Sequence, residues 1–361
     1  MRRRHALFAG PGLCWGITRA APKAPRVLFL NPGEPVERGK GPHWRMTSQF
    51  MTAAARSFGI ELEVLYAERD HLLMLQQADE VARRATAPDY VVMVNEKLAG
   101  PQMLKAFART PAKVLMIHNG LTPEQRQEVG NEREQLRNWI GTLTTDEARA
   151  QYRLMEELAR QLGDRVPQVV GITGDRATPV SLERAQGISD FIDRSGRGHI
   201  LQTAFSDWSS TDAESKAAVL LSRHPQVNVM WGANDTMALG VLRAVRARQA
   251  PVLVGGTGAW PDALASISEG GLAASVGSHF FIGAWAMVLL HDYHHGMDFA
   301  AHGGPVQKLD YMVVVNRDNA PQYGRAVYKR DAAFDFRVYS KHLHPRPGPY
   351  RFDLAPLVRA A

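Results

Sequence analysis

The chain has little of what several protein classes need. Of its 361 residues only Cys14 is a cysteine, which excludes an intrachain disulfide and a metal site built from several cysteines. Beyond the N-terminal segment, no stretch approaches the ~18 apolar residues of a membrane-spanning helix, so we expect a soluble mature protein. The net charge is +7, but the basic residues are scattered and partly terminal. Because no basic face is evident, no nucleic-acid partner is expected.

Catalytic and cofactor motifs are also missing. There is no Gly-x-Ser-x-Gly elbow, no phosphate loop and no His-Glu-x-x-His, and the segment 256–260 lacks the third glycine of a dinucleotide fingerprint. His291 and His295 would lie on one helical face and could suggest a metal, but a solvated helix end is the favoured interpretation. His342 and His344 are interpreted in the same way. The sequence therefore predicts no enzyme, no cofactor and no metal.

The N-terminus is typical of a targeting segment. A charged start, Met1-Arg-Arg-Arg-His, precedes an apolar stretch at 6–17 that Gly10-Pro11-Gly12 interrupts, and Ala20-Ala21 offers small residues for cleavage. We expect a secretory signal peptide over 1–24, removed between about Ala21 and Pro25. A disordered N-terminal tail is the alternative.

Strand and helix patterns alternate from Arg26 onward. The continuous apolar run at 27–30 is typical of a parallel strand buried on both faces. Phe50, Ala54 and Phe58 lie four residues apart before Gly59, which predicts a helix. The first half yields strands at 27–30, 60–66, 90–94 and 114–117 and helices at 46–58, 74–87 and 101–108. This βαβ alternation predicts a parallel sheet, and the length predicts two domains at about 150 residues each.

The second half continues the alternation. A polar stretch at 121–138 is interpreted as an insertion or an exposed helix. Beyond it we expect helices at 147–162, 182–195, 211–224 and 282–293, and strands at 166–172, 200–205, 227–231, 252–254, 273–276 and 312–315.

The turn at Asn234 and Asp235 is the strongest candidate for a binding site. It follows the alternating strand at 227–231 and precedes a helix that begins near Met237. In open α/β sheets ligands bind outside the carboxyl ends of the strands, so both side chains lie where a small polar molecule would be held. Asp235 could equally be only the helix N-cap. The amide of Asn234 both donates and accepts, which suits a hydroxyl-rich ligand.

The run Asn234-Asp-Thr-Met-Ala-Leu-Gly240 resembles a signature of type I periplasmic binding proteins, the sugar receptors related to ribose-binding protein and to the ligand cores of lactose-repressor-like regulators. Segments 169–175, 183–188, 252–258 and 271–276 resemble other parts of the same layout, in the same order. The resemblance covers about residues 26 to 316. It implies two α/β, doubly wound parallel-sheet lobes, joined by a three-strand hinge and closing on a ligand by rotation about a few loop positions.

The resemblance also implies a division of the chain. Residues 139–146 match the family's first crossing from lobe to lobe. The N-terminal lobe comprises 25–143 and 280–312, the C-terminal lobe 144–279 and 313–322, and an extension over 323–361, rich in proline and aromatics, packs on a lobe or offers a partner surface.

Arg184 matches the family's ligand-binding arginine. A guanidinium fork can donate to two neighbouring hydroxyls or to a ring oxygen. The alternative is a structural salt bridge to Glu183 or Asp175.

Aromatic and polar side chains at other strand ends complete the expected pocket. Trp44, Trp208 and Trp260 are predicted in loops, where an indole can cover the apolar face of a sugar or simply pack at the rim. Where close relatives of ribose-binding protein carry aspartate and glutamine, this chain has Thr257 and Ser278, and a pocket poorer in carboxylate and amide groups is expected to prefer a different sugar, a polyol or a small signal molecule. The predicted ligand-binding residues are Trp44, Glu96, Asn119, Arg184, Trp208, Asn234, Thr257 and Ser278.

The resemblance implies a periplasmic, monomeric solute receptor that closes on a sugar or sugar-like molecule and delivers it to an ABC transporter permease in the inner membrane. The alternative is a ligand-sensing subunit that presents its ligand to a histidine kinase or a chemoreceptor. An intracellular regulator is disfavoured because the residues before the first strand contain no helix-turn-helix pattern.

Overall fold

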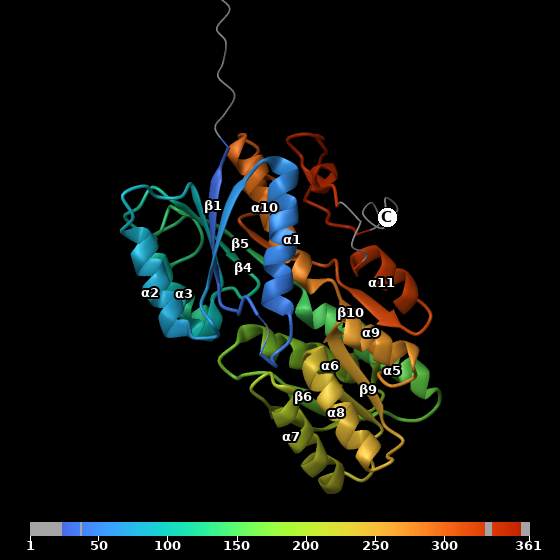
Figure 1. Cartoon of the computed structure of the whole chain (residues 1–361). Coiled ribbons are helices and arrows are strands. Elements are labelled where there is room, and N and C mark those ends of the chain that lie inside the picture. Colours follow the sequence, from blue (N-terminus) through green and yellow to red (C-terminus); the bar gives the residue numbers. More distant parts are fainter. Residues whose placement is uncertain (1–23, 37, 329–333, 355–361) are drawn as a thin grey trace, which may run out of the picture.

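The computed structural model describes residues 24–36, 38–328 and 334–354. Two six-stranded sheets in these residues form the centres of two α/β lobes, as Figure 1 shows. The predicted fold class is therefore confirmed. The predicted signal segment 1–24, apart from its last residue, lies outside the described residues, as does Cys14.

The first lobe contains a fully parallel sheet in the order β11-β5-β4-β3-β1-β2. Its central strands are continuous apolar runs because helices cover both of their faces. The strands are β1 (Arg26–Asn31), β2 (Glu61–Tyr66), β3 (Tyr90–Met93), β4 (Lys113–Ile117), β5 (Trp139–Thr145) and β11 (Val306–Leu309).

The second lobe contains a sheet in the order β12-β10-β9-β8-β6-β7, parallel except for the antiparallel pair β10–β12. Its strands are β6 (Gln168–Thr173), β7 (His199–Phe205), β8 (Val229–Gly232), β9 (Leu253–Gly258), β10 (Ala274–Gly277) and β12 (Val313–Asn316).

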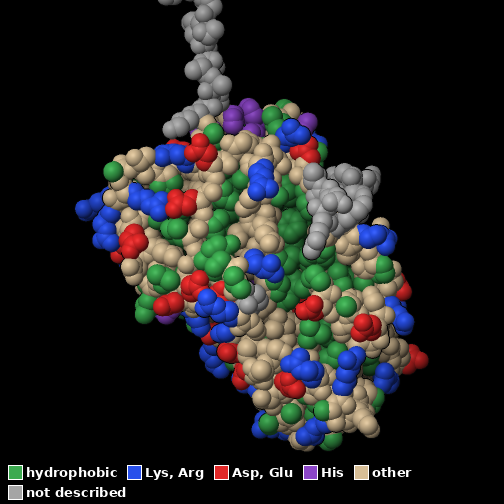
Figure 2. Space-filling model, viewed as in Figure 1, with side chains coloured by type: hydrophobic (Ala, Val, Ile, Leu, Met, Phe, Trp, Pro, Cys, Tyr) green, Lys and Arg blue, Asp and Glu red, His purple; other side chains and the backbone are tan. Residues whose placement is uncertain are grey.

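Helices flank both sheets (Figure 1). The first lobe has α1 (His43–Phe58), α2 (His71–Ala82), α3 (Gly100–Phe107), α4 (Pro123–Val129) and α10 (Ile282–His294). The second has α5 (Glu147–Leu162), α6 (Pro179–Ser195), α7 (Ser210–Arg223), α8 (Asp235–Ala247), α9 (Pro261–Ser268) and α11 (Ala320–Tyr328). In the described residues no helix combines the length and the apolar character needed to cross a membrane. On the face seen in Figure 2, charges of both signs are interspersed.

Several boundaries differ from those predicted. Helix α1 begins at His43, so Trp44 lies in its first turn and not in a loop. Helix α2 ends at Ala82. In the polar stretch 121–138, the helix covers only Pro123–Val129, and the Glu132 carboxylate is buried against Arg126 and Thr142. Strand β11 and helix α9 were not predicted.

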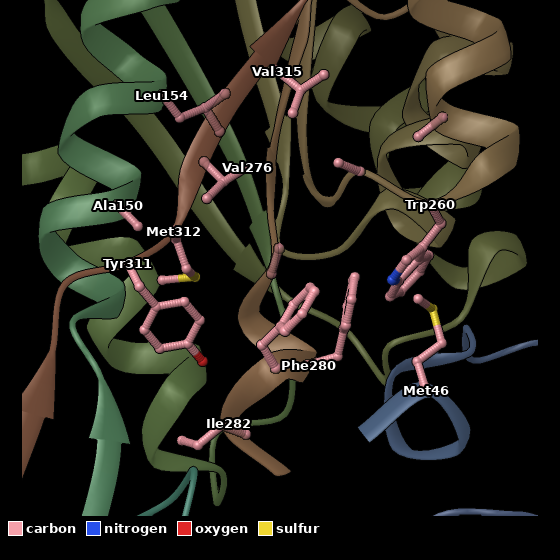
Figure 3. Packing of buried hydrophobic residues seen from close by; sticks show 14 of the residues in the cluster. Met46, Ala150, Leu154, Trp260, Val276, Phe280, Ile282, Tyr311, Met312 and Val315 are labelled. Carbon is pink, nitrogen blue, oxygen red and sulfur yellow. The ribbon is translucent and has the colours of Figure 1, made fainter. Parts of the chain in front are cut away.

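The chain crosses between the lobes three times in the described residues: after β5, after β10 and between β11 and β12. Figure 3 shows the packing beside these crossings, where Tyr311 and Met312 lie next to Ala150 of α5. In the same view Trp260 of the second lobe points toward Met46 of α1 in the first. Apolar contacts therefore continue across the hinge.

The C-terminal extension contacts both lobes. Helix α11 packs on α9 of the second lobe. Farther along, the Phe352 ring stacks on Trp285 of α10 with centroids 4.7 Å apart, and Tyr339 contacts the same indole at 4.8 Å. The buried Asp292 carboxylate accepts hydrogen bonds from the Lys341 amide and the Tyr350 hydroxyl. Residues 334–354 are therefore anchored on the first lobe.

Candidate ligand-binding site

A cavity with about 480 Å³ of empty space lies between the lobes, at the carboxyl ends of strands from both sheets. Its lining residues are Lys40, His43, Trp44, Arg69, Glu96, His118, Asn119, Thr178, Val180, Arg184, Trp208, Asn234, Trp260 and His279. We call this space the cleft cavity.

Six of the eight predicted ligand-binding residues line the cleft cavity: Trp44, Glu96, Asn119, Arg184, Trp208 and Asn234. The placement corrects the other two. Thr257 is fully buried and its hydroxyl accepts a hydrogen bond of 2.7 Å from Gln151 of α5, because its position in β9 turns it toward that helix. Ser278 has a φ of 81°, and its hydroxyl lies 3.0 Å from that of Tyr323 in α11. Both side chains therefore point away from the cavity.

Arg184 is held by a buried carboxylate that the sequence reasoning did not identify. Its Nε donates to Glu147 at 2.8 Å and its Nη1 donates to the Ala233 carbonyl at 2.5 Å. The expected partners are engaged elsewhere, since Glu183 pairs with Lys308 and Asp175 with Lys97. Nη2 is thus the part of the fork that can donate to a ligand.

The pair is fixed in its charged form. Burial by itself would raise the pKa of Glu147, but the Arg184 guanidinium outweighs it and lowers that pKa to about 2. The positive fork is therefore preorganised at the cavity surface before a ligand arrives.

The N-cap role that we considered for Asp235 belongs to Asn234. Asn234 is the N-cap of α8, since its Oδ1 accepts from the Met237 amide at 2.7 Å. Its Nδ2 points to the Trp208 and Lys40 carbonyls at 3.3 and 3.4 Å, so the amide has protein partners on both sides.

Asp235 is not the cap. It is fully buried and accepts from the Ser275 hydroxyl at 2.6 Å and the Trp260 amide at 3.0 Å. Burial raises the pKa of this carboxyl to about 6. Asp235 therefore fixes the turn that places Trp260 at the cavity.

Three histidines were missed by the sequence reasoning. The His43 ring stacks on His279 with centroids 4.4 Å apart and an interplanar angle of 3°, and lies 4.6 Å from His118. His118 directly follows strand β4, and one residue separates His279 from the end of β10. Because ligands bind outside the carboxyl ends of strands in such sheets, these positions could have identified both histidines. His43, in the first turn of α1, has no such signal. We call His43, His118 and His279 the imidazole wall.

Trp208 occupies its place at a conformational cost. Its φ of 73° lies in the left-handed region that most side chains avoid. Its indole packs directly on Gly174, where a Cβ would lie only 2.0 Å from the ring. The glycine that directly follows β6 is therefore what leaves room for this indole at the cavity.

Contacts across the cleft show that the lobes are closed. Lys97 of the first lobe forms an ion pair with Asp175 of the second, and the Val180 amide donates to Asn119 Oδ1 at 3.2 Å. Lys40 also reaches Asp207 at 3.8 Å. The cavity in this form is enclosed by both lobes.

Residues 36–296 match the family described as the periplasmic binding protein domain, and the chain belongs to that family. It is a solute-binding receptor of the periplasm and not an enzyme.

Individual relatives make the similarity more specific. A D-allose-binding periplasmic protein of Escherichia coli (strain K12) is 23% identical over 70% of this chain and 80% of its own length. The ribose import binding protein of Bacillus subtilis (strain 168) is 33% identical over 37% of this chain, a match that spans 43% of that protein.

Solved structures agree in fold. A periplasmic sugar-binding protein from Pseudomonas fluorescens superposes with a TM-score of 0.81 at 32% identity, over 92% of this chain and 99% of that one. An ABC transporter periplasmic solute binding protein from Actinobacillus succinogenes with bound D-allose gives a TM-score of 0.71 at 17% identity, over 83% and 100%. The second likeness bears on the fold alone.

Proposed function

We propose that the protein binds a small polyhydroxy molecule, a sugar or a sugar-like compound, in the cleft cavity. One observation carries the proposal: polar atoms of the cavity residues are buried without a hydrogen-bond partner among the described residues. They are Nδ1 and Nε2 of His43, Nδ1 of His118, Nδ1 of His279, Nδ2 of Asn119, Oγ1 of Thr178 and Nε1 of Trp260.

Unpaired polar atoms of this kind are costly in a folded protein, at about 1–3 kcal/mol each. A ligand with several hydroxyl groups can supply both donors and acceptors to them. The indoles of Trp44 and Trp260 add apolar surface for the C–H face of a ring. Hydroxyl-rich and apolar faces on one small molecule are the chemistry of a sugar.

The names of the relatives support the same class, since they include proteins that bind D-allose and import ribose. Because one of these relatives is named as an import protein, we also propose that the receptor delivers its ligand to an ABC transporter permease in the inner membrane. The closed lobes give such a partner a shape to recognise. Presentation of the ligand to a histidine kinase or a chemoreceptor is the alternative, and the C-terminal extension on the first lobe supplies additional surface for it.

A thermal-shift screen tests the ligand class. D-ribose, D-allose, D-galactose and myo-inositol are added at pH 7.5, and a bound compound at 100 times its Kd should stabilise the protein by about 2.7 kcal/mol. Small-angle scattering should show a smaller radius of gyration with that compound, and chromatography should recover it unchanged. A screen without any stabilising compound, or turnover of the compound, would contradict the proposal.

A matched pair of variants tests the site. Trp260→Phe removes the unpaired cavity N–H together with part of the aromatic surface, so we expect Kd to rise by at least about five- to tenfold, the equivalent of about 1–1.4 kcal/mol. Trp231→Phe removes a similar unpaired N–H that lies in the core of the second lobe, away from the cavity, and should leave Kd unchanged. Equal effects of the two variants would argue against ligand contact at Trp260.

A further inference from the structure

The imidazole wall brings together side chains from three separate parts of the chain. His43 comes from α1, His118 follows β4 and His279 follows β10. His118 and His279 are buried, and both ring nitrogens of His43 are enclosed. Four ring nitrogens of the wall have no protein partner among the described residues, and all three residues line the cleft cavity.

The surroundings of the wall disfavour protonation. Burial, the other imidazoles and the Arg184 guanidinium all lower the pKa of His43. Burial lowers the pKa of His118 to about 4 and that of His279 well below its ordinary value. Glu147 acts in the opposite direction on His118 and His279, but its carboxylate is already bound by Arg184.

The other ionisable groups near the cavity balance one another. Arg69 and Lys97 act on the Glu96 carboxyl, whose pKa burial raises, and Lys40 lies near Asp207. Asp235 lies behind the cavity wall and is satisfied by Ser275 and Trp260. The cavity thus offers unsatisfied hydrogen-bonding atoms, while its ionic groups already face opposite charges.

We propose that His43, His118 and His279 bind the ligand as neutral imidazoles, so that the cavity takes an uncharged sugar or polyol and closure of the lobes on it releases protons. This inference rests on the proposed function and names the charge class of its ligand. A neutral imidazole has one donor and one acceptor, which matches the two roles of a hydroxyl group. Two imidazolium rings stacked 4.4 Å apart would repel each other and would leave only donors.

The size of the pH effect follows from linkage. When the lobes open, the imidazoles become hydrated and return toward their ordinary pKa of about 6.5. Since the closed form holds fewer protons, acid favours the open form. Each imidazole that must lose a proton multiplies Kd by a factor of about 1 + 10^(6.5 − pH). This factor is roughly 11 at pH 5.5 and close to 1 at pH 7.5. One such group predicts a rise in Kd of roughly tenfold, and each further imidazole adds less because the neighbouring rings disfavour a second proton.

Calorimetry with D-allose, or with another neutral compound that the screen identifies, tests the proposal. Kd is measured at pH 7.5 and 5.5, and proton release is counted at pH 6.0 from titrations in two buffers of different ionisation enthalpy. We expect a Kd at least tenfold higher at pH 5.5 and net release of protons on binding. A Kd that changes less than twofold, without proton release, would overturn the proposal about the neutral imidazoles but would not contradict the proposed sugar-binding function. Absence of binding by every neutral compound would contradict both the proposal and the proposed function.

Charged probes and variants complete the test. D-galacturonate and D-ribose 5-phosphate should not bind, and tighter binding of either at pH 5.5 would overturn the proposal. His118→Asn keeps an amide at a position with a φ of 66°, which asparagine tolerates, and should reduce the pH dependence of Kd. His199→Gln alters an exposed histidine at the start of β7 and should keep it. If Kd depends equally on pH in the wild type, His118→Asn and His199→Gln, groups other than His118 cause the dependence, and the proposal fails for that residue. If His118→Asn does not fold, the number of protons that the wild type releases on binding decides the question.

Discussion

Replacing Arg184 with alanine would leave the Glu147 carboxylate buried without its cation. The two side chains are 4% and 1% exposed and are joined at 2.8 Å, so little water could take the place of the guanidinium. Removing one partner of a buried pair costs about 3–5 kcal/mol. We therefore expect Arg184→Ala to lower the free energy of unfolding by about that amount at pH 7.5.

The pH dependence gives this prediction its sign. In the wild type the folded pKa of Glu147, about 2, lies below the unfolded value, so its contribution is present above about pH 4.5 and is lost as the pH falls toward 2. In Arg184→Ala, burial without the cation raises that pKa, and the carboxyl can bind a proton as the pH falls. The stability difference between the two proteins should shrink from pH 7.5 to pH 5.

Urea denaturation at several pH values measures this difference. Arg184→Met combined with Glu147→Gln removes both charges and should recover most of the stability. Arg126→Ala is the matched control. It likewise removes the arginine partner of a buried carboxylate, that of Glu132, but this pair lies outside the cavity. Arg184→Ala should also weaken ligand binding by about 1.5–3 kcal/mol, whereas Arg126→Ala should not. Wild-type stability of Arg184→Ala at pH 7.5, or a loss that grows on acidification, would refute the reasoning.

Four further predictions concern capping, closure, the extension and export. Asn234→Ala removes an N-cap and should cost about 0.5–2 kcal/mol in chemical denaturation; an unchanged midpoint would contradict the cap. Lys97→Ala removes a partly exposed pair across the cleft and should change Kd by less than about fivefold, with a smaller difference at high salt. Asp292→Asn should speed hydrogen exchange of 334–354 while strand β8 keeps its protection, and uniform protection would refute that anchoring role. Intact-mass measurement of a periplasmic extract should find a chain that begins between about Ala21 and Pro25, and a full-length product would contradict cleavage.

The alternation of strands and helices was readable from the sequence because it depends on neighbouring residues. Continuous apolar runs such as 27–30 mark strands buried on both faces, and Gly59 ends α1 with a φ of 66°. Strand β11 was not predicted because it lies at the edge of its sheet, where Val306 and Lys308 are exposed. Its pattern lacks the apolar run that identified the central strands.

The sequence also located much of the cleft cavity, since parallel strands end at one edge of a sheet wherever the chain folds in this way. What it could not decide is how side chains meet across long separations. Glu147, not Glu183, holds Arg184 because helices α5 and α6 pack together. Asn234 and Asp235 differ by one position, yet only the packing of β9 and β10 makes Asp235 a buried acceptor. The imidazole wall exists only because α1 lies against the segment after β10, a contact between residues more than 230 positions apart.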